Sequence, residues 1–125
     1  MIDIRQEFNS ELQYRFPNVF RHKEYVGVGP GWWDIIRNLS SELEAIIEKL
    51  PEEERLSLYV VQIKEKFGGL RFYMNAETDE MFDLITKAEE ESLKICEECG
   101  KEGAQFCGIG WIKTFCKSCL KIERK

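Results

Sequence analysis

The chain has 125 residues, of which 33% are charged and 43% are apolar, the composition of an ordinary globular protein. This length allows one domain, or one small domain with a metal-stabilised appendage too short to bury a core of its own. No stretch approaches the roughly 20 apolar residues of a membrane span, and the formal net charge of -5 argues against a general polyanion binder but not against a local basic face.

Three helices are predicted from apolar residues that recur on one face. The first follows Ile4, Phe8, Leu12 and Phe16 and ends before Pro17. The glycine-rich residues 18–31 predict a loop, and a longer helix is predicted from Trp32 to about Leu50, where Pro51 ends it. The third helix begins at Thr78 or Asp79, and its predicted buried stripe is Phe82, Ile85 and Ala88.

Strands are predicted where β-branched and aromatic residues cluster. Residues 56–63 and 70–73 are expected to form a β-hairpin. Gly68 and Gly69 would supply the positive φ angles of its two-residue turn. Residues 109–115 predict a further strand, which returns the second cysteine pair to the first.

Four cysteines occur as two CxxC pairs with sixteen residues between them, which is the spacing of a zinc site. The predicted ligands of one structural Zn(II) are Cys96, Cys99, Cys116 and Cys119. A shell filled by protein supports a fold and argues against hydrolysis, because catalytic zinc keeps a position for water. Gly100 would allow a turn whose N–H groups point at sulfur. Cys107 lies outside the pattern, and is interpreted as a small apolar filler or as a competing ligand.

A second candidate site is the predicted hairpin, whose cations lie beside aromatic residues. Such a pattern can hold a phosphate and a base together, and the candidate binding residues are Lys64, Lys66, Arg71 and Tyr73. The competing interpretation is structural: alternation places half of these side chains in the core and the charged ones in solvent, where Glu65 offsets them. We favour the structural interpretation.

Trp32 and Trp33 are a third candidate, because neighbouring positions on a helix do not face one core. At least one ring is therefore expected at an edge or an interface, unless a bent start of the helix buries both. Gly27, Gly29 and Gly31 precede a helix N-terminus that could attract an anion. Their spacing matches no phosphate-binding motif, and a plain turn is favoured.

Residues 31–36 (GWWDII), 62–73 (QIKEKFGGLRFY) and 88–92 (AEEES), together with the paired cysteines and the intervening Trp111 and Thr114, resemble a group of small proteins of bacteria and their phages. The resemblance covers roughly residues 30–119. It implies a phage or prophage accessory protein rather than a housekeeping enzyme, and it transfers no catalytic residues.

We therefore expect an α+β fold in which helices cover a short antiparallel sheet in residues 1–95, with a zinc ribbon or knuckle docked on it in residues 96–125. No nucleophile or paired carboxylate stands at a motif spacing from His22, the single histidine, so no enzyme is expected. The leading functional hypothesis is a cytoplasmic accessory protein that binds, and could inhibit, a host protein. The alternative is nucleic-acid or nucleotide binding through Lys64, Lys66, Arg71, Lys113, Lys117 and Lys121.

Overall fold

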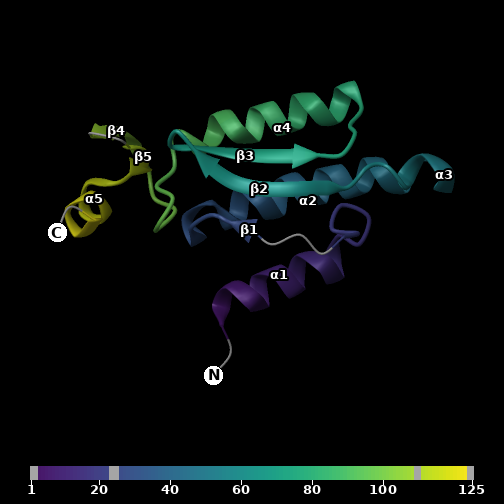
Figure 1. Cartoon of the computed structure of the whole chain (residues 1–125), viewed down its shortest axis with the longest axis horizontal. Coiled ribbons are helices and arrows are strands. Elements are labelled where there is room, and N and C mark those ends of the chain that lie inside the picture. Colours follow the sequence, from purple (N-terminus) through teal and green to yellow (C-terminus); the bar gives the residue numbers. More distant parts are fainter. Residues whose placement is uncertain (1–2, 23–25, 109–110, 124–125) are drawn as a thin grey trace.

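The computed structural model describes residues 3–22, 26–108 and 111–123 of the chain. Its elements, shown in Figure 1, are α1 (Ile4–Arg15), β1 (Val26–Gly27), the 3-10 helix η1 (Pro30–Trp32), α2 (Trp33–Glu48), α3 (Glu52–Arg55), β2 (Val60–Lys66), β3 (Gly69–Met74), α4 (Asp79–Ser92), β4 (Ala104–Gly108), β5 (Trp111–Phe115) and α5 (Lys117–Glu123). This arrangement confirms the predicted α+β class. None of the described helices is both long enough and apolar enough to cross a membrane.

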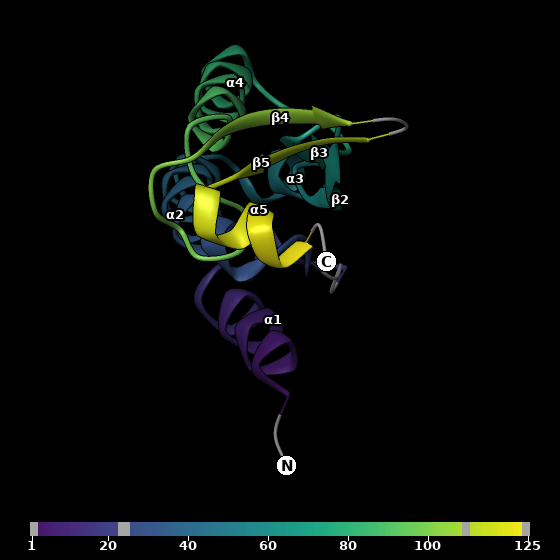
Figure 2. The ribbon, with the colours of Figure 1, turned by 90° about the vertical axis from the view of Figure 1, so that its left-hand side faces the viewer.

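The central sheet has the strand order β1-β2-β3, and Figure 2 shows α2 and α4 on the same side of β2 and β3. On the side of the helices, Ile63, Leu70 and Phe72 are buried. The β2–β3 pair is antiparallel, as predicted, whereas β1 pairs with β2 in parallel. Residues 18–31 were predicted to be a loop throughout, and β1 is therefore a correction to that prediction.

The turn of the β2–β3 hairpin is one residue earlier than predicted. It consists of Phe67 and Gly68, with φ angles of 54° and 82°, and Gly69 already belongs to β3, where it pairs with Lys66. This register keeps Ile63 opposite the buried Phe72, whereas a slip of one residue would turn the apolar side chains outward. Positive φ costs a non-glycine residue about 1–2 kcal/mol.

Both tryptophan rings are buried, with exposed fractions of 0% for Trp32 and 9% for Trp33, so the alternative of a bent helix start holds and neither ring lies at an exposed edge. The reason is the bend between η1 and α2, which sends the two rings to different neighbours. Trp32 donates its indole N–H to the carbonyl of Ile95 at 2.8 Å. Trp33 stacks on Phe8 of α1, with 4.4 Å between ring centroids.

Helix α4 begins at its predicted cap, since the Thr78 hydroxyl accepts a hydrogen bond from the backbone N–H of Met81. Its buried stripe differs from the prediction at one position: Met81 is buried together with Ile85 and Ala88, whereas Phe82 is 54% exposed. Met81 lies four residues before Ile85, so it shares the buried face of the helix as well as a residue three before would.

Helix α4 also covers the outer edge of β3. The backbone N–H of Leu70 donates to the Ser92 hydroxyl at 2.9 Å, and that of Phe72 donates to the Glu89 carboxylate at 2.9 Å. Backbone groups of an edge strand are otherwise available to pair with another chain. Glu89 is therefore half-buried and hydrogen-bonded, whereas its neighbours Glu90 and Glu91 are exposed.

The Glu89→Ala variant tests this edge contact. We expect it to lower the free energy of unfolding by about 1–2 kcal/mol, because a buried N–H loses a charged acceptor. Urea unfolding measures the change, and Glu90→Ala, one residue along the same helix, is the matched control and should be close to neutral. Equal losses in the two variants would contradict a specific role of Glu89.

Candidate functional site

Four cysteine sulfurs meet at one point in the C-terminal part of the chain. Cys96 follows α4, Cys99 lies in the next turn, Cys116 follows β5 and Cys119 lies in α5. All four sulfurs lie within 4.8 Å of one another, and the Cys99 and Cys116 sulfurs are 3.6 Å apart. Four sulfurs at about 2.3 Å from a tetrahedral zinc ion would be about 3.8 Å apart. The cluster therefore fits one zinc ion, as predicted.

The backbone around the sulfurs is arranged as metal-binding turns require. Gly100 donates its N–H to the Cys96 carbonyl at 3.0 Å, and its φ of 80° turns the chain back so that the Cys96 N–H reaches the Lys101 carbonyl at 2.7 Å. The N–H of Cys119 points at the Cys116 sulfur at 3.5 Å and lowers the pKa of that thiol to about 7. Desolvation and the neighbouring sulfurs raise the pKa of the Cys119 thiol. Zinc would offset the repulsion among the thiolates.

Between the two cysteine pairs, β4 and β5 form an antiparallel hairpin, in which Ala104 is opposite Phe115 and Cys107 is opposite Ile112. An isolated bridge joins Ile95 to Glu102 just before it. Two cysteine turns linked by a hairpin are the arrangement expected of the predicted zinc ribbon, and we call residues 96–123 the ribbon. The side chain of Cys107 lies outside the described part of the structure.

The first cysteine turn, residues 96–100, lies directly on the glycine-rich segment before α2. The backbone N–H of Gly31 donates to the Glu97 carbonyl at 2.7 Å, and that of Gly29 donates to the Glu97 carboxylate at 3.0 Å. A Cβ atom on Gly31 would lie 2.0 Å from the Cys96 carbonyl oxygen, and one on Gly29 would lie 2.5 Å from the Glu97 carbonyl oxygen. We call Gly29 and Gly31 the seat of the ribbon. Their N–H groups, which the sequence suggested could bind an anion, are already hydrogen-bonded to Glu97.

A second contact joins the ribbon to the turn of the β2–β3 hairpin. The Thr114 hydroxyl donates to the Gly68 carbonyl at 2.6 Å. Glu65 forms an ion pair with Lys113 and accepts a hydrogen bond from the N–H of Gly68. Lys113, one of the predicted nucleic-acid contacts, is thus engaged with Glu65.

The opposite side of the hairpin gathers the other predicted binding residues. Lys64 is directly opposite Arg71, and its ammonium lies 5.8 Å from the centre of the Tyr73 ring. Lys66 lies two residues along β2, with its ammonium 5.6 Å from the centre of the Phe67 ring. We call Lys64, Lys66, Arg71 and Tyr73 the cationic face. Within the described residues none of its three cations forms an ion pair.

Successive residues of β2 point to opposite sides of the sheet, so one side contacts the ribbon and the other carries the cationic face. Glu65, on the inner side, contacts the ribbon, and its charge does not offset the cationic face in the way that the sequence suggested. Of the tail bases, Lys117 is exposed on α5, and the side chain of Lys121 lies outside the described part of the structure.

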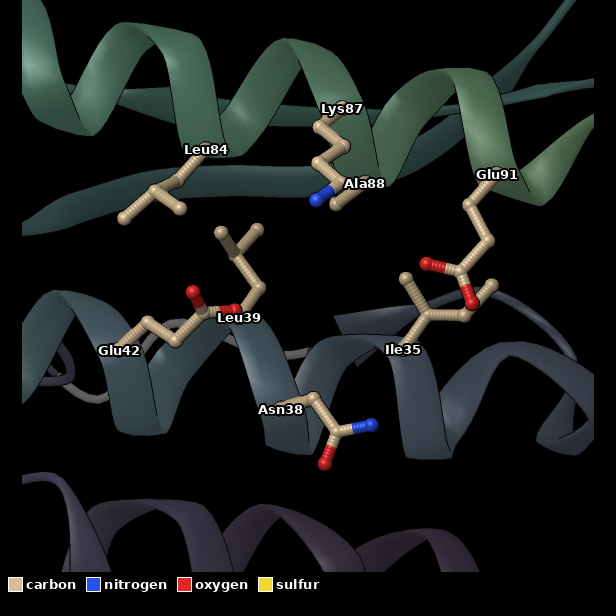
Figure 3. A pocket seen from close by; sticks show the side chains of 8 residues that line it. All are labelled: Ile35, Asn38, Leu39, Glu42, Leu84, Lys87, Ala88 and Glu91. Carbon is tan, nitrogen blue, oxygen red and sulfur yellow. The ribbon is translucent and has the colours of Figure 1, made fainter.

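A shallow groove runs between α2 and α4, and Figure 3 shows its lining. Leu39 of α2 and Leu84 of α4 point toward each other across it, and Lys87 and Glu91 reach in from α4. The apolar floor is the packing interface of the two helices with a charged rim. This groove joins none of the predicted site residues.

Sequence reasoning missed the residues that attach the ribbon. In the sequence, Glu97 stands between two cysteines and resembles the many exposed acids of the chain. In the structure it is only 7% exposed, and this burial raises the pKa of its carboxyl. The glycines before Trp32 were the available signal, because closely spaced glycines can mark a close approach of two backbones. Their partner, however, is more than sixty residues away.

The zinc site is tested with Cys99→Ala. We expect the protein to contain one zinc ion per chain, and the variant to lose it together with several kcal/mol of stability, because metal-binding free energy is folding free energy in a small ribbon. Metal analysis, thermal melts with and without chelator, and proteolysis of residues 96–125 measure these effects. Cys107→Ser, outside the paired motif, should keep the zinc ion. Identical melts with and without chelator would contradict the assignment.

The seat is tested with Gly31→Ala. The added methyl group meets backbone atoms that have little freedom to move, so we expect a loss of about 3 kcal/mol in urea unfolding with the zinc content unchanged. Gly69→Ala is the matched control, because its new Cβ would meet only the ends of the Leu93 and Arg71 side chains within 3.5 Å. Equal losses in the two variants would argue against the seat.

Comparison with protein-family models, with characterised proteins and with solved structures found no match. The resemblance to small bacterial and phage proteins therefore gains no support from these comparisons. The structure itself supports an α+β protein whose four C-terminal cysteines could hold one metal ion, with zinc the ion that their chemistry favours.

Proposed function

We propose that the protein is a non-catalytic binding module, stabilised by one structural zinc ion, that binds nucleic acid through the cationic face. The observation that supports this proposal is the placement of Lys64, Lys66 and Arg71 beside Tyr73, on the side of the hairpin opposite its buried apolar side chains.

The charges are closely spaced. Side chains directly opposite on neighbouring strands are about 5 Å apart at Cβ, and alternate residues along a strand are separated by about 7 Å. Three positive charges therefore share a small area. Like charges at such positions destabilise a sheet, and a polyanion would remove the repulsion while releasing its own counterions.

Binding without catalysis is proposed because of the metal shell. Four cysteine ligands would fill the tetrahedron that zinc prefers and would leave no position for an activated water. The cationic face offers ammonium, guanidinium and phenol groups, which suit the holding of phosphates and bases.

A protein partner is the competing candidate, as in the accessory protein that binds a host protein. The tryptophan pair cannot supply its contact surface, since both rings are buried. An acidic protein segment on the cationic face would satisfy the charges equally well. Nucleic acid is favoured because aromatic rings accompany the cations, as in sites that bind phosphates and bases together. The phage or prophage role stays a prediction from the resemblance.

The double variant Lys64→Gln, Lys66→Gln tests the cationic face. Each phosphate contact contributes about -0.7 to the slope of log affinity against log salt for a single strand. Three contacts predict a slope of about -2, and the variant should retain about -0.7 and bind at least 10-fold more weakly at low salt. Fluorescence anisotropy with a labelled oligonucleotide measures both quantities.

The matched control is Lys49→Gln, Lys87→Gln, which removes the same charge from exposed positions just after α2 and on α4. It should bind like the unaltered protein. An equal loss in the control, or tighter binding of an acidic peptide than of the oligonucleotide, would contradict the proposal.

A further inference from the structure

The tip of the β2–β3 hairpin holds an unusual residue for its backbone conformation. A two-residue turn with positive φ at both positions favours Asn-Gly, Asp-Gly or Gly-Gly. The second position is Gly68, but the first is Phe67, with a φ of 54°. A bulky side chain in the left-handed region is a genuine outlier, and such outliers cluster at functional sites.

The Phe67 ring contributes little to the core. It is 63% exposed, whereas the buried apolar side chains of the same hairpin belong to Ile63, Leu70 and Phe72. The ammonium of Lys66 lies 5.6 Å from the centre of the Phe67 ring. The turn thus combines backbone strain with an apolar ring in water, and asparagine at this position would relieve both.

Phe67 also extends the cationic face into an ordered row. Starting from the tip, the row runs from the Phe67 ring through Lys66 to the cross-strand pair of Lys64 and Arg71, and ends at the Tyr73 ring, which is 38% exposed. The strand from residue 69 to residue 73 spans roughly 13 Å. Two aromatic rings with cations between them match a short run of nucleotides, in which bases stack on rings and phosphates contact the cations.

We infer that Phe67 is a base-stacking residue and that the ligand of the cationic face is single-stranded nucleic acid. This inference rests on the proposed function and adds the strandedness of the ligand. In a duplex the faces of the bases are hidden in the stack, so a ring can stack on them only where the strand is unpaired. A duplex would meet only the cations.

The test variant is Phe67→Asn, which should separate stability from binding. Its melting temperature should rise by about 3 °C, because asparagine tolerates positive φ and no ring is left in water. Its affinity for a labelled single-stranded oligonucleotide should fall about 10-fold, with the salt slope unchanged. Binding to a duplex of the same sequence should be weaker than single-strand binding in the unaltered protein and should not change in the variant.

Two further variants separate stacking from general apolar contact. Phe67→Tyr keeps a planar ring and should retain single-strand affinity, whereas Phe67→Leu keeps an apolar side chain without a ring and should lose it. Unchanged single-strand affinity in Phe67→Asn would overturn the inference, as would equal binding of duplex and single strand, or preferred binding of an acidic peptide.

Nucleic-acid binding and the stacking role of Phe67 are refuted by different results. If Lys64→Gln, Lys66→Gln loses binding and Phe67→Asn does not, nucleic-acid binding stands and the stacking role is refuted. If the unaltered protein binds neither a single strand nor a duplex, both proposals are refuted.

Discussion

The backbone of the first cysteine turn lies in direct contact with the backbone before α2, and the placement of the ribbon on the rest of the α+β fold depends on this contact. The N–H of Gly31 reaches the Glu97 carbonyl at 2.7 Å, with no room for a side chain between them. The Trp32 indole, one residue further, is bonded to the Ile95 carbonyl just before the turn. A metal ion that fixes the conformation of residues 96–100 would therefore also fix the surface against which residues 29–32, just before α2, are packed.

Much of this fold could be predicted from the sequence because its signals are local. The cysteine spacing, the helical period of α2 and the alternation along the hairpin each depend on residues close together in the chain. β1 could not be predicted this way, because it has only two residues. It forms because the Val26 N–H donates to the Asn9 side-chain oxygen and because Val26 pairs with Ile63 of β2. The seat for the ribbon and the burial of Glu97 were hidden for the same reason, since their partners are distant in sequence.

The two sides of the β2–β3 hairpin have different roles. Glu65 and the Gly68 carbonyl face the ribbon and hold Lys113 and Thr114. The next residues along the same strand face the other way and make the cationic face. Successive residues of a strand point to opposite sides of the sheet. The register of β2 against β3 therefore fixes both the residues that attach the ribbon and the residues that form the exposed face. The placement of Phe67 at the first turn position follows from the same register.

The seat contacts also bear on the order in which the chain folds. The hydrogen bonds from Gly29 and Trp32 join residues 68 and 63 positions apart, and loop closure over such separations slows folding. During synthesis, residues 29–32 leave the ribosome long before the cysteines that complete their surroundings. Until the ribbon forms, the Trp32 indole and the N–H groups of Gly29 and Gly31 lack these hydrogen-bond partners. The availability of zinc at that late stage would decide whether the nascent chain matures or stays open to aggregation and proteolysis.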